Sequence, residues 1–309
     1  MPAKISNKKA QVFTLIAIAL IGLVFVSFSI YSVAEQRHSV KTRISTMEGF
    51  LNSIELNLQR QIYISGFRII FLAEDEITKN GEYITNVDTF FNEAFFQGTV
   101  AGQSADIMLG ATYNDLIASI KDKAKKINVD IVMSNPSITI SQVDPWHVKM
   151  TLFADFVMSD KSKLAKWEKQ QQISAYIPVS KFEDPVYTVN TIALISKKII
   201  QTPHEGQYVV EGNSANLLDH VNSDYYSFNS DAPSFLKRLQ GDLTADENGI
   251  ESFVNSNKLS TQGLPVYDKS KIDHIYFSSL NPNNCYVAGM PSWFRIDDTH
   301  LIKYNATCG

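Results

Sequence analysis

One stretch of the chain, residues 11–34, has no charged side chain and is almost entirely apolar, QVFTLIAIALIGLVFVSFSIYSVA. A helix needs about 20 apolar residues to cross a bilayer's hydrocarbon, whereas the apolar part of a cleaved secretory signal is usually about 7–15 residues long. Charged residues flank the stretch, with Lys8 and Lys9 before it and Glu35 and Arg37 after it. We therefore expect a single membrane-spanning helix that stays in the mature protein; a cleaved secretory signal is the alternative.

The rest of the chain has the composition of a globular protein. Of its 309 residues 44% are hydrophobic and only 19% are charged, enough apolar side chain to bury a core. The net charge of −4 disfavours a nucleic-acid binder, because such proteins present a strongly basic surface. This length allows one large domain or two modest ones.

The side of the membrane on which the long part lies is not decided by charge, since basic residues flank the span on both sides. The two cysteines, Cys285 and Cys308, lie close to the carboxyl end, and Asn305 begins an Asn-Ala-Thr triplet for N-glycosylation. Free cysteines in a reducing compartment and a triplet that arose by chance are the alternatives. Together the features favour an extracellular domain with a Cys285–Cys308 disulfide and Asn305 as a candidate glycosylation site.

Apolar residues continue beyond the span at helical spacing, with polar residues mostly between them. They form a narrow seam: Val40, Ile44, Met47, Leu51, Ile54, Leu58, Ile62, Ser65, Ile69 and Leu72. Because no proline interrupts the chain here, the span and an amphipathic helix over residues 35–76 can form one rod, ended by a turn at Asn80-Gly81. The seam packs either on the chain's own domain or against the same helix of neighbouring subunits.

Residues 77–200 are expected to form an α+β outer domain. Helical patterns cover residues 87–96 and 113–127, and the second ends in lysines that suit a helix carboxyl terminus. From residue 129 the apolar period changes to two, with turns expected at Asn135-Pro136 and Asp144-Pro145. The pattern predicts an antiparallel sheet that lays one face on the long helix; Trp146 and Trp167 are expected as core or strand-edge residues.

A second, turn-rich module is expected over residues 201–309. Its pattern predicts short helices near residues 214–221 and 232–240, a strand over 274–278, and a final helix capped by Asp297 or Asp298. The expected fold is therefore α+β: a long amino-terminal helix packed on an antiparallel sheet, followed by a smaller α/β module.

Motifs for catalysis or metal binding are absent from the sequence at usable spacing. The six histidines are scattered singly; they are His38, His147, His204, His220, His274 and His300. A Ser162/Lys166 pair lies in what reads as a charged turn, and the segment from Thr244 to Asn255 resembles a calcium loop but lacks the carboxylates at its first and last positions. We expect no catalytic, metal or cofactor site, and no enzyme activity.

The amino-terminal residues resemble those of archaeal type IV pilin-like proteins. The resemblance rests on the basic Lys8-Lys9-Ala10 leader, on Gln11, and on an apolar helix that continues into an amphipathic one. The resemblance implies that a prepilin peptidase cuts residues 1–10 away after Ala10, leaving Gln11 as the amino terminus, and that freed helices of like subunits pack together. Many members have Glu at the fifth position after cleavage, where this chain has Leu15.

Two further strings, residues 182–187 and 249–255, look like segments of uncharacterised archaeal surface proteins with such a leader. The functional expectation is a membrane-anchored pilin-like surface protein that acts in assembly or adhesion. The alternative is an anchored receptor or sensor that binds a ligand without assembling, which would need a concave pocket in the outer domain. An anchored enzyme is the least favoured reading.

Overall fold

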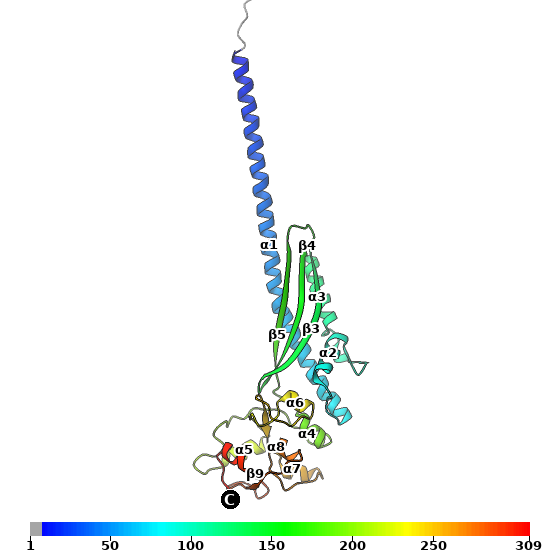
Figure 1. Cartoon of the computed structure of the whole chain (residues 1–309), viewed down its shortest axis with the longest axis vertical. Coiled ribbons are helices and arrows are strands. Elements are labelled where there is room, and N and C mark those ends of the chain that lie inside the picture. The colour runs from blue at the N-terminus through cyan, green and yellow to red at the C-terminus, as the bar shows by residue number, and fades with distance from the viewer. Residues whose placement is uncertain (1–7) are drawn as a thin grey trace, which may run out of the picture.

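The structure, a computed structural model, describes residues 8–309 and is a mixed helix and sheet fold, as the sequence predicts. Figure 1 shows a long rod, helix α1 (Lys8–Asn80), whose second half carries a three-stranded sheet and whose far end carries a module of short elements. Residues 1–7 of the expected leader lie outside the described residues.

Helix α1 is continuous over 73 residues, about 110 Å at 1.5 Å per residue. It ends at Asn80, where Gly81 has a φ of +68° and its N–H donates to the Ile77 carbonyl at 2.9 Å. Glycine takes this left-handed conformation without steric cost, which is why helices often end before it. The predicted stop at Asn80-Gly81 is confirmed.

The apolar seam of α1 packs on the chain's own sheet from Met47 onward. Its buried members are Met47, Leu51, Ile54, Leu58, Ile62, Ser65, Ile69 and Leu72, whereas Ile44 is 42% exposed. Gly66 allows the close approach, because a Cβ there would lie 2.7 Å from Ile177 Cδ1 and 3.2 Å from Met150 Sδ. In this part of α1, the seam therefore faces the protein's own core.

The sheet consists of β3 (Val129–Asp144), β4 (His147–Asp160) and β5 (Lys166–Pro178), antiparallel in that order. The turn expected at Asp144-Pro145 joins β3 to β4. The turn expected at Asn135-Pro136 is wrong: β3 runs through both residues with a register shift between Ser134 and Ser137, and Asn135 has a φ of +49°. A bulge accommodates the proline, which has no N–H to donate to the ladder.

Helices α2 (Val87–Gln97) and α3 (Tyr113–Lys126) pack near β3 and follow the predicted ranges closely. Between them lie β1 (Thr99–Val100), β2 (Gln103–Ser104) and the 3-10 helix η1 (Asp106–Met108). Trp146 and Trp167 are partly buried and pack against the main core, as expected.

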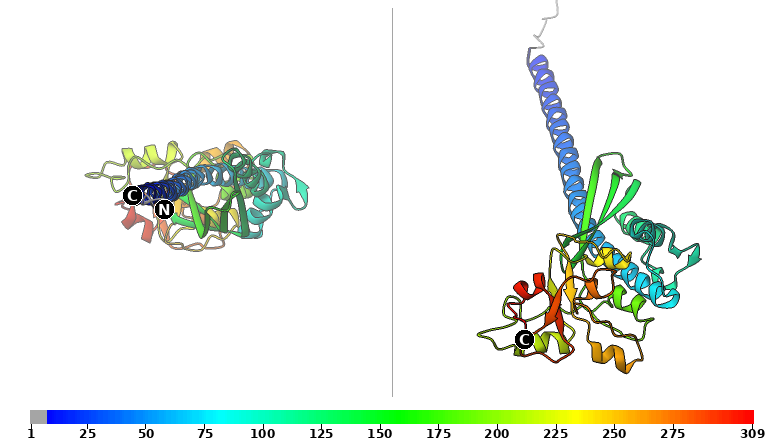
Figure 2. Two further views of the ribbon diagram at one scale, coloured as in Figure 1. Left: turned by 90° about the horizontal axis from the view of Figure 1, so that it is seen from above. Right: turned by 60° about the horizontal axis from the view of Figure 1, so that its bottom comes forward.

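The distal module lies beyond the sheet, at the end of the molecule opposite the amino terminus (Figure 2). Its elements are α4 (Pro185–Asn190), α5 (Ala215–Asn222), β6 (Tyr226–Phe228), α6 (Phe235–Leu239), β7 (Ile250–Ser252), α7 (Ser256–Thr261), α8 (Asp273–Tyr276), β8 (Asn284–Tyr286), β9 (Arg295–Asp297) and α9 (Asp298–Lys303). Strand β6 pairs with β7 and β8 with β9, both antiparallel.

Within this module the helices predicted near residues 214–221 and 232–240 are confirmed as α5 and α6, and one predicted element is wrong. The strand expected over residues 274–278 is replaced by helix α8, whose turn is closed by the Tyr276 N–H donating to the Ile272 carbonyl at 2.7 Å. A short, wholly buried run does not show a helical or a strand period, so the pattern could not separate the two. Asp297 caps α9, and Cys285 and Cys308 form a disulfide with their Cα atoms 5.7 Å apart.

Candidate functional site

Strand β7 brings buried charged groups together from several parts of the distal module. Glu251 and Ser252 are both fully buried in it, and successive side chains of a strand point to opposite faces. Each residue therefore belongs to a different polar cluster. The Glu251 cluster comprises Asn229, Glu251, Asp297, His300, Lys303 and Tyr304; the Arg238 cluster comprises Asp184, Tyr226, Arg238, Ser252 and Asp273.

In the Glu251 cluster both carboxylate oxygens of Glu251 are fully used. Oε1 accepts from Lys303 Nζ at 2.5 Å and from the Tyr304 hydroxyl at 2.7 Å, and Oε2 accepts from Asn229 Nδ2 at 2.6 Å. His300 Nε2 lies 3.0 Å from the same Oε2, and its Nδ1 lies 2.7 Å from Asp297 Oδ1. His300 is thus held between two carboxylates.

The charges in this cluster support one another. Burial alone would lower the pKa of His300, but Glu251 and Asp297 raise that pKa to about 9. Burial would conversely raise the pKa of Glu251, yet the charges of Lys303 and His300 hold it well below its usual range. At neutral pH the cluster is therefore a protonated imidazole and an ammonium between two carboxylates.

A metal ion is the other occupant that such residues suggest. Donor atoms of Glu251, His274 and His300 lie within 4.8 Å of one another, and all three side chains are buried. However, both nitrogens of His300 already face carboxylates, and Glu251 already accepts four hydrogen bonds. The arrangement stabilises the fold by neutralising its own charges, and a cation would have to displace the His300 proton.

The Arg238 cluster is fully buried. Arg238 Nη1 donates to Asp184 Oδ2 at 2.6 Å, and its Nη2 lies 3.1 Å from Asp273 Oδ2. The Tyr226 hydroxyl donates to Asp184 at 2.7 Å and the Ser252 hydroxyl donates to Asp273 at 2.6 Å. Burial is the largest influence on the pKa of Asp273 and would raise it, but the charges and hydrogen bonds of Arg238 and His274 together outweigh burial and lower that pKa, so the carboxylate stays ionised.

The strings 182–187 and 249–255 meet at the edge of this cluster. The Tyr187 hydroxyl donates to the Phe253 carbonyl at 3.0 Å, and Lys197 Nζ donates to the same carbonyl at 2.7 Å. Lys197 Nζ also lies over the Tyr187 ring, 4.6 Å from its centroid. These strings therefore contribute buried contacts to the packing of the distal module.

The residues that the sequence pointed to lie apart from these clusters. Gln11 is exposed on α1, while the side chain of Ala10 lies outside the description. Asn305 is exposed with a φ of +51°, and its Nδ2 donates to the Val209 carbonyl at 3.1 Å. Ser162 is in the turn between β4 and β5, and Lys166 pairs with Glu168.

The calcium-like segment serves as ordinary loop and cap structure. Asp246 accepts hydrogen bonds from the Ser234 hydroxyl at 3.1 Å and from the Asn248 N–H at 3.0 Å. Asn255 caps α7 by accepting from the Asn257 and Lys258 N–H groups. Asp246 and Asn255 are therefore engaged in local hydrogen bonds of the protein.

Sequence reasoning missed the meeting of His274 and His300 with Glu251, because these residues are far apart along the chain. The other histidines stay separate: His38 is exposed on α1, His147 lies beside Asp144, His204 beside Asp219, and His220 is buried against Thr202. One signal was available, since Glu251 stands in the otherwise uncharged string Ile250-Glu251-Ser252-Phe253-Val254.

One hollow of the distal module lies beside α8. It has a volume of about 300 Å³ and is walled mainly by Leu259, Leu264, Tyr267, Tyr276 and Phe277. A larger, open groove of about 610 Å³ lies between α1 and β5 and is lined by polar side chains. Ligand pockets usually measure about 300–1,000 Å³, so the first hollow is at the lower end of that range.

In comparisons with protein-family models, curated proteins and solved structures, nothing matches this chain.

Glu74, which lies outside both clusters, has a carboxyl group that gives a testable pH dependence. Glu74, on α1, has Oε1 buried without a hydrogen-bond partner among the described residues. Burial, together with the nearby Glu183 and Asp184, raises the pKa of Glu74 to about 9. Because this pKa is raised in the folded state, ionisation of Glu74 opposes folding increasingly as pH rises from about 4.5 to about 9.

We expect Glu74→Gln to stabilise the protein at pH 7 by about 2 kcal/mol and to leave its stability at pH 4 unchanged. Denaturant unfolding of the detergent-solubilised chain at several pH values measures the difference. Glu76→Gln, two residues along the same helix, is the control, and we expect its effect to be near zero. An equal gain from Glu74→Gln at both pH values would contradict the prediction.

Proposed function

We propose that this chain is a membrane-anchored, non-enzymatic surface protein that acts in assembly or adhesion through α1, in the manner of the pilin-like proteins it resembles. The observation that carries the proposal is the contrast between the two halves of α1. Residues 11–34 expose apolar side chains all around the helix, including Phe13, Leu15 and Phe25, whereas the seam from Met47 is buried in the domain. An apolar helix segment that packs on no other element in the described part of the chain must be covered by lipid or by other helices.

The extracellular orientation is part of the proposal and is supported by the disulfide. Disulfides persist in oxidising compartments and are rare in the cytosol, and Cys285 and Cys308 are bonded. In this orientation Asn305, which is exposed, is available for glycosylation. Cleavage by a prepilin peptidase after Ala10 would free Gln11 at the start of the apolar helix.

The non-enzymatic part is supported by the two polar clusters. Apart from Lys303, which is partly exposed, their charged groups are buried, and these groups pair with one another rather than facing a cavity. The hollow beside α8 favours a second candidate, an anchored domain that binds a small ligand without assembling. The two candidates differ in whether copies of α1 touch.

Cysteine cross-linking in native membranes tests the assembly proposal. The chain's own cysteines are paired, so Ile18→Cys in the span introduces one reactive thiol at an exposed position of α1. We expect mild oxidation to yield cross-linked dimers and, when Ile18→Cys is combined with Leu56→Cys, larger multimers. Lys121→Cys, on the exposed side of α3, is the control that should stay monomeric.

The same control variant reports the orientation. A membrane-impermeant maleimide should label Lys121→Cys in intact cells if the domain is outside. Monomers alone from Ile18→Cys and from other exposed positions of the span would exclude assembly through α1 and leave the ligand-binding candidate. Protection of Lys121→Cys in intact cells would reverse the orientation.

A further inference from the structure

The end of the outer domain nearest the span gathers lysines from two elements that are far apart in the sequence. Helix α3 ends in three of them, and the turn between β4 and β5 with the first residue of β5 supplies three more. We call this set the basic tip: Lys123, Lys125, Lys126, Lys161, Lys163 and Lys166, all exposed. Val129, just after α3, pairs with Asp160, just before the turn, so the two groups lie side by side (Figure 1).

The basic tip carries an excess of positive charge. Lys125 lies 3.5 Å from Asp122, Lys161 lies 3.8 Å from Asp130, and Lys166 pairs with Glu168, all in exposed pairs. Within the described part of the chain, Lys123, Lys126 and Lys163 have no carboxylate at ion-pair distance. Exposed pairs contribute little stability, so even the paired lysines remain available to another anion.

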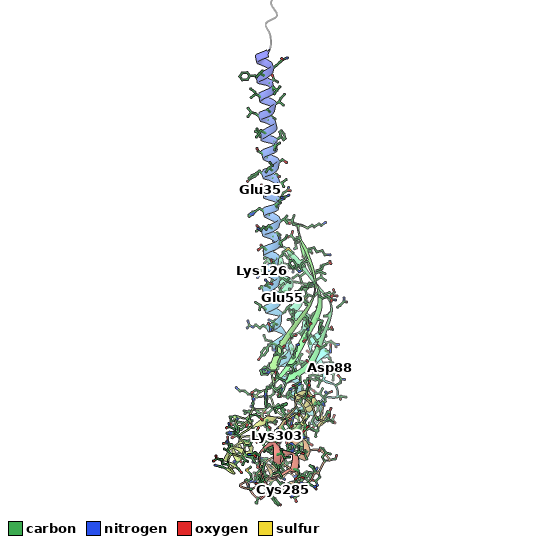
Figure 3. All side chains as sticks on the ribbon, turned by 60° about the vertical axis from the view of Figure 1, so that its left-hand side comes forward. Glu35, Glu55, Asp88, Lys126, Cys285 and Lys303 are labelled. Atoms are coloured by element: carbon green, nitrogen blue, oxygen red, sulfur yellow. A yellow bond between two sulfur atoms is a disulfide. The ribbon has the colours of Figure 1, made fainter. Side chains whose placement is uncertain are left out.

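Arg43 fixes the basic tip to α1 close to the membrane. Its guanidinium pairs with Asp160 and donates to the Ile127 carbonyl at 2.6 Å and to the Asn128 carbonyl at 2.9 Å. Arg43 is nine residues beyond Ala34, the last residue of the apolar stretch, which is about 14 Å along a helix. Figure 3 shows Lys126 between the levels of Glu35 and Glu55 along the rod, nearer to Glu55.

The remaining gap to the lipid is short. The polar headgroup layer extends about 5–7 Å beyond the hydrocarbon on each side, so the level at which Arg43 joins α1 to the tip is about 7–9 Å beyond it. Arg37 and Lys41 are exposed on α1 across the same interval, and with Glu35 beside them they leave one further net positive charge there. Because α1 holds the basic tip at this distance from the lipid, the effective concentration of headgroups at the tip is high.

We propose that the basic tip docks on anionic lipid headgroups of the bilayer that holds α1, and that this docking sets the orientation of the outer domain relative to the membrane. The inference rests on the anchoring part of the proposed function. Each lysine near an anionic surface favours the docked state about fivefold, and salt screens the attraction. Removing two unpaired lysines should therefore reduce the docking equilibrium by roughly thirtyfold.

Fluorescence resonance energy transfer between the full chain and the lipids of a nanodisc tests the docking proposal. A donor dye is placed on Leu164→Cys, which is 46% exposed in the turn of the tip, and the acceptor is on the lipid headgroups. We expect stronger transfer in discs that contain phosphatidylglycerol than in discs of phosphatidylcholine alone, and loss of the difference at about 1 M salt. Lys126→Gln/Lys163→Gln should abolish most of the difference.

Lys181→Gln/Lys198→Gln removes two exposed lysines beyond the other end of β5 and should behave like the parent. Equal energy transfer in both kinds of disc would overturn the docking proposal, and so would an equal loss of the lipid-dependent difference in the two double variants. Co-migration of the chain with the discs would still show that α1 anchors the protein. A chain that does not enter the discs overturns both the anchor and the docking. Docking in discs that hold one copy supports the inference regardless of assembly.

Discussion

Replacement of Arg238 by Met should destabilise the protein by about 3–5 kcal/mol, because it leaves Asp184 and Asp273 buried without their shared cation. All three side chains are fully buried, so water cannot replace the guanidinium. A loss of this size is a large part of the 5–15 kcal/mol that usually holds a domain folded. Denaturant unfolding of the purified full chain measures it.

Two further variants separate the charge effect from the change in shape. Lys237→Met alters the neighbouring residue, whose ammonium lies 3.7 Å from the partly exposed Asp246, and should cost less than about 1 kcal/mol. Adding Asp184→Asn and Asp273→Asn to Arg238→Met should recover part of the lost stability, since no unpaired charge then remains buried. Similar losses from Arg238→Met and Lys237→Met would contradict the account.

Reduction of the Cys285–Cys308 disulfide should cost about 3 kcal/mol, the loop-closure value for a sequence separation of 23 residues. The disulfide joins β8 to residues 306–309. Few backbone hydrogen bonds otherwise attach these residues to β8; one of them runs from the Gly309 N–H to the Tyr286 carbonyl at 2.9 Å. Denaturant unfolding with and without a reducing agent measures the cost. Hydrogen exchange should locate the loosened region in residues 284–309.

The Cys285→Ser/Cys308→Ser variant is the matched control for this experiment. It should have the stability of the reduced parent and should not respond to the reducing agent. If reduction leaves the parent's unfolding curve unchanged, the disulfide does not contribute to stability in the way proposed.

The elements that the sequence predicted well are those with a long, regular period. The seam of α1 repeats over many turns, and the alternation in β4 runs through most of the strand, so local pattern and tertiary packing agree. In β5 the apolar alternation covers only the second half, at Ile173, Ala175 and Ile177. At Asn135-Pro136 the local turn signal was overruled, because pairing with β4 on both sides of the bulge outweighs one missing donor. Tertiary contacts therefore determine that residues 135 and 136 belong to a strand and not to a turn.

The polar clusters could not be predicted, because their members come from distant segments. Asp184, Arg238 and Asp273 meet only after α4, α6 and α8 have packed around β7, and no spacing along the chain encodes that meeting. The length of α8 is also set by packing, since a buried run such as residues 272–276 satisfies helix and strand equally well. Burial of charge in this module is a property of the assembled fold.

The uninterrupted helix α1 has a mechanical consequence. About 69 Å of it, from Ala34 to Asn80, lies beyond the apolar stretch, at 1.5 Å per residue. Membrane helices tilt by about 20° on average, and such a tilt would carry the far end of this lever sideways by about 24 Å. A change of lipid thickness or of neighbouring helices that alters the tilt by a few degrees would therefore move the distal module by several ångströms, and α1 would convert the state of the bilayer into displacement at the surface.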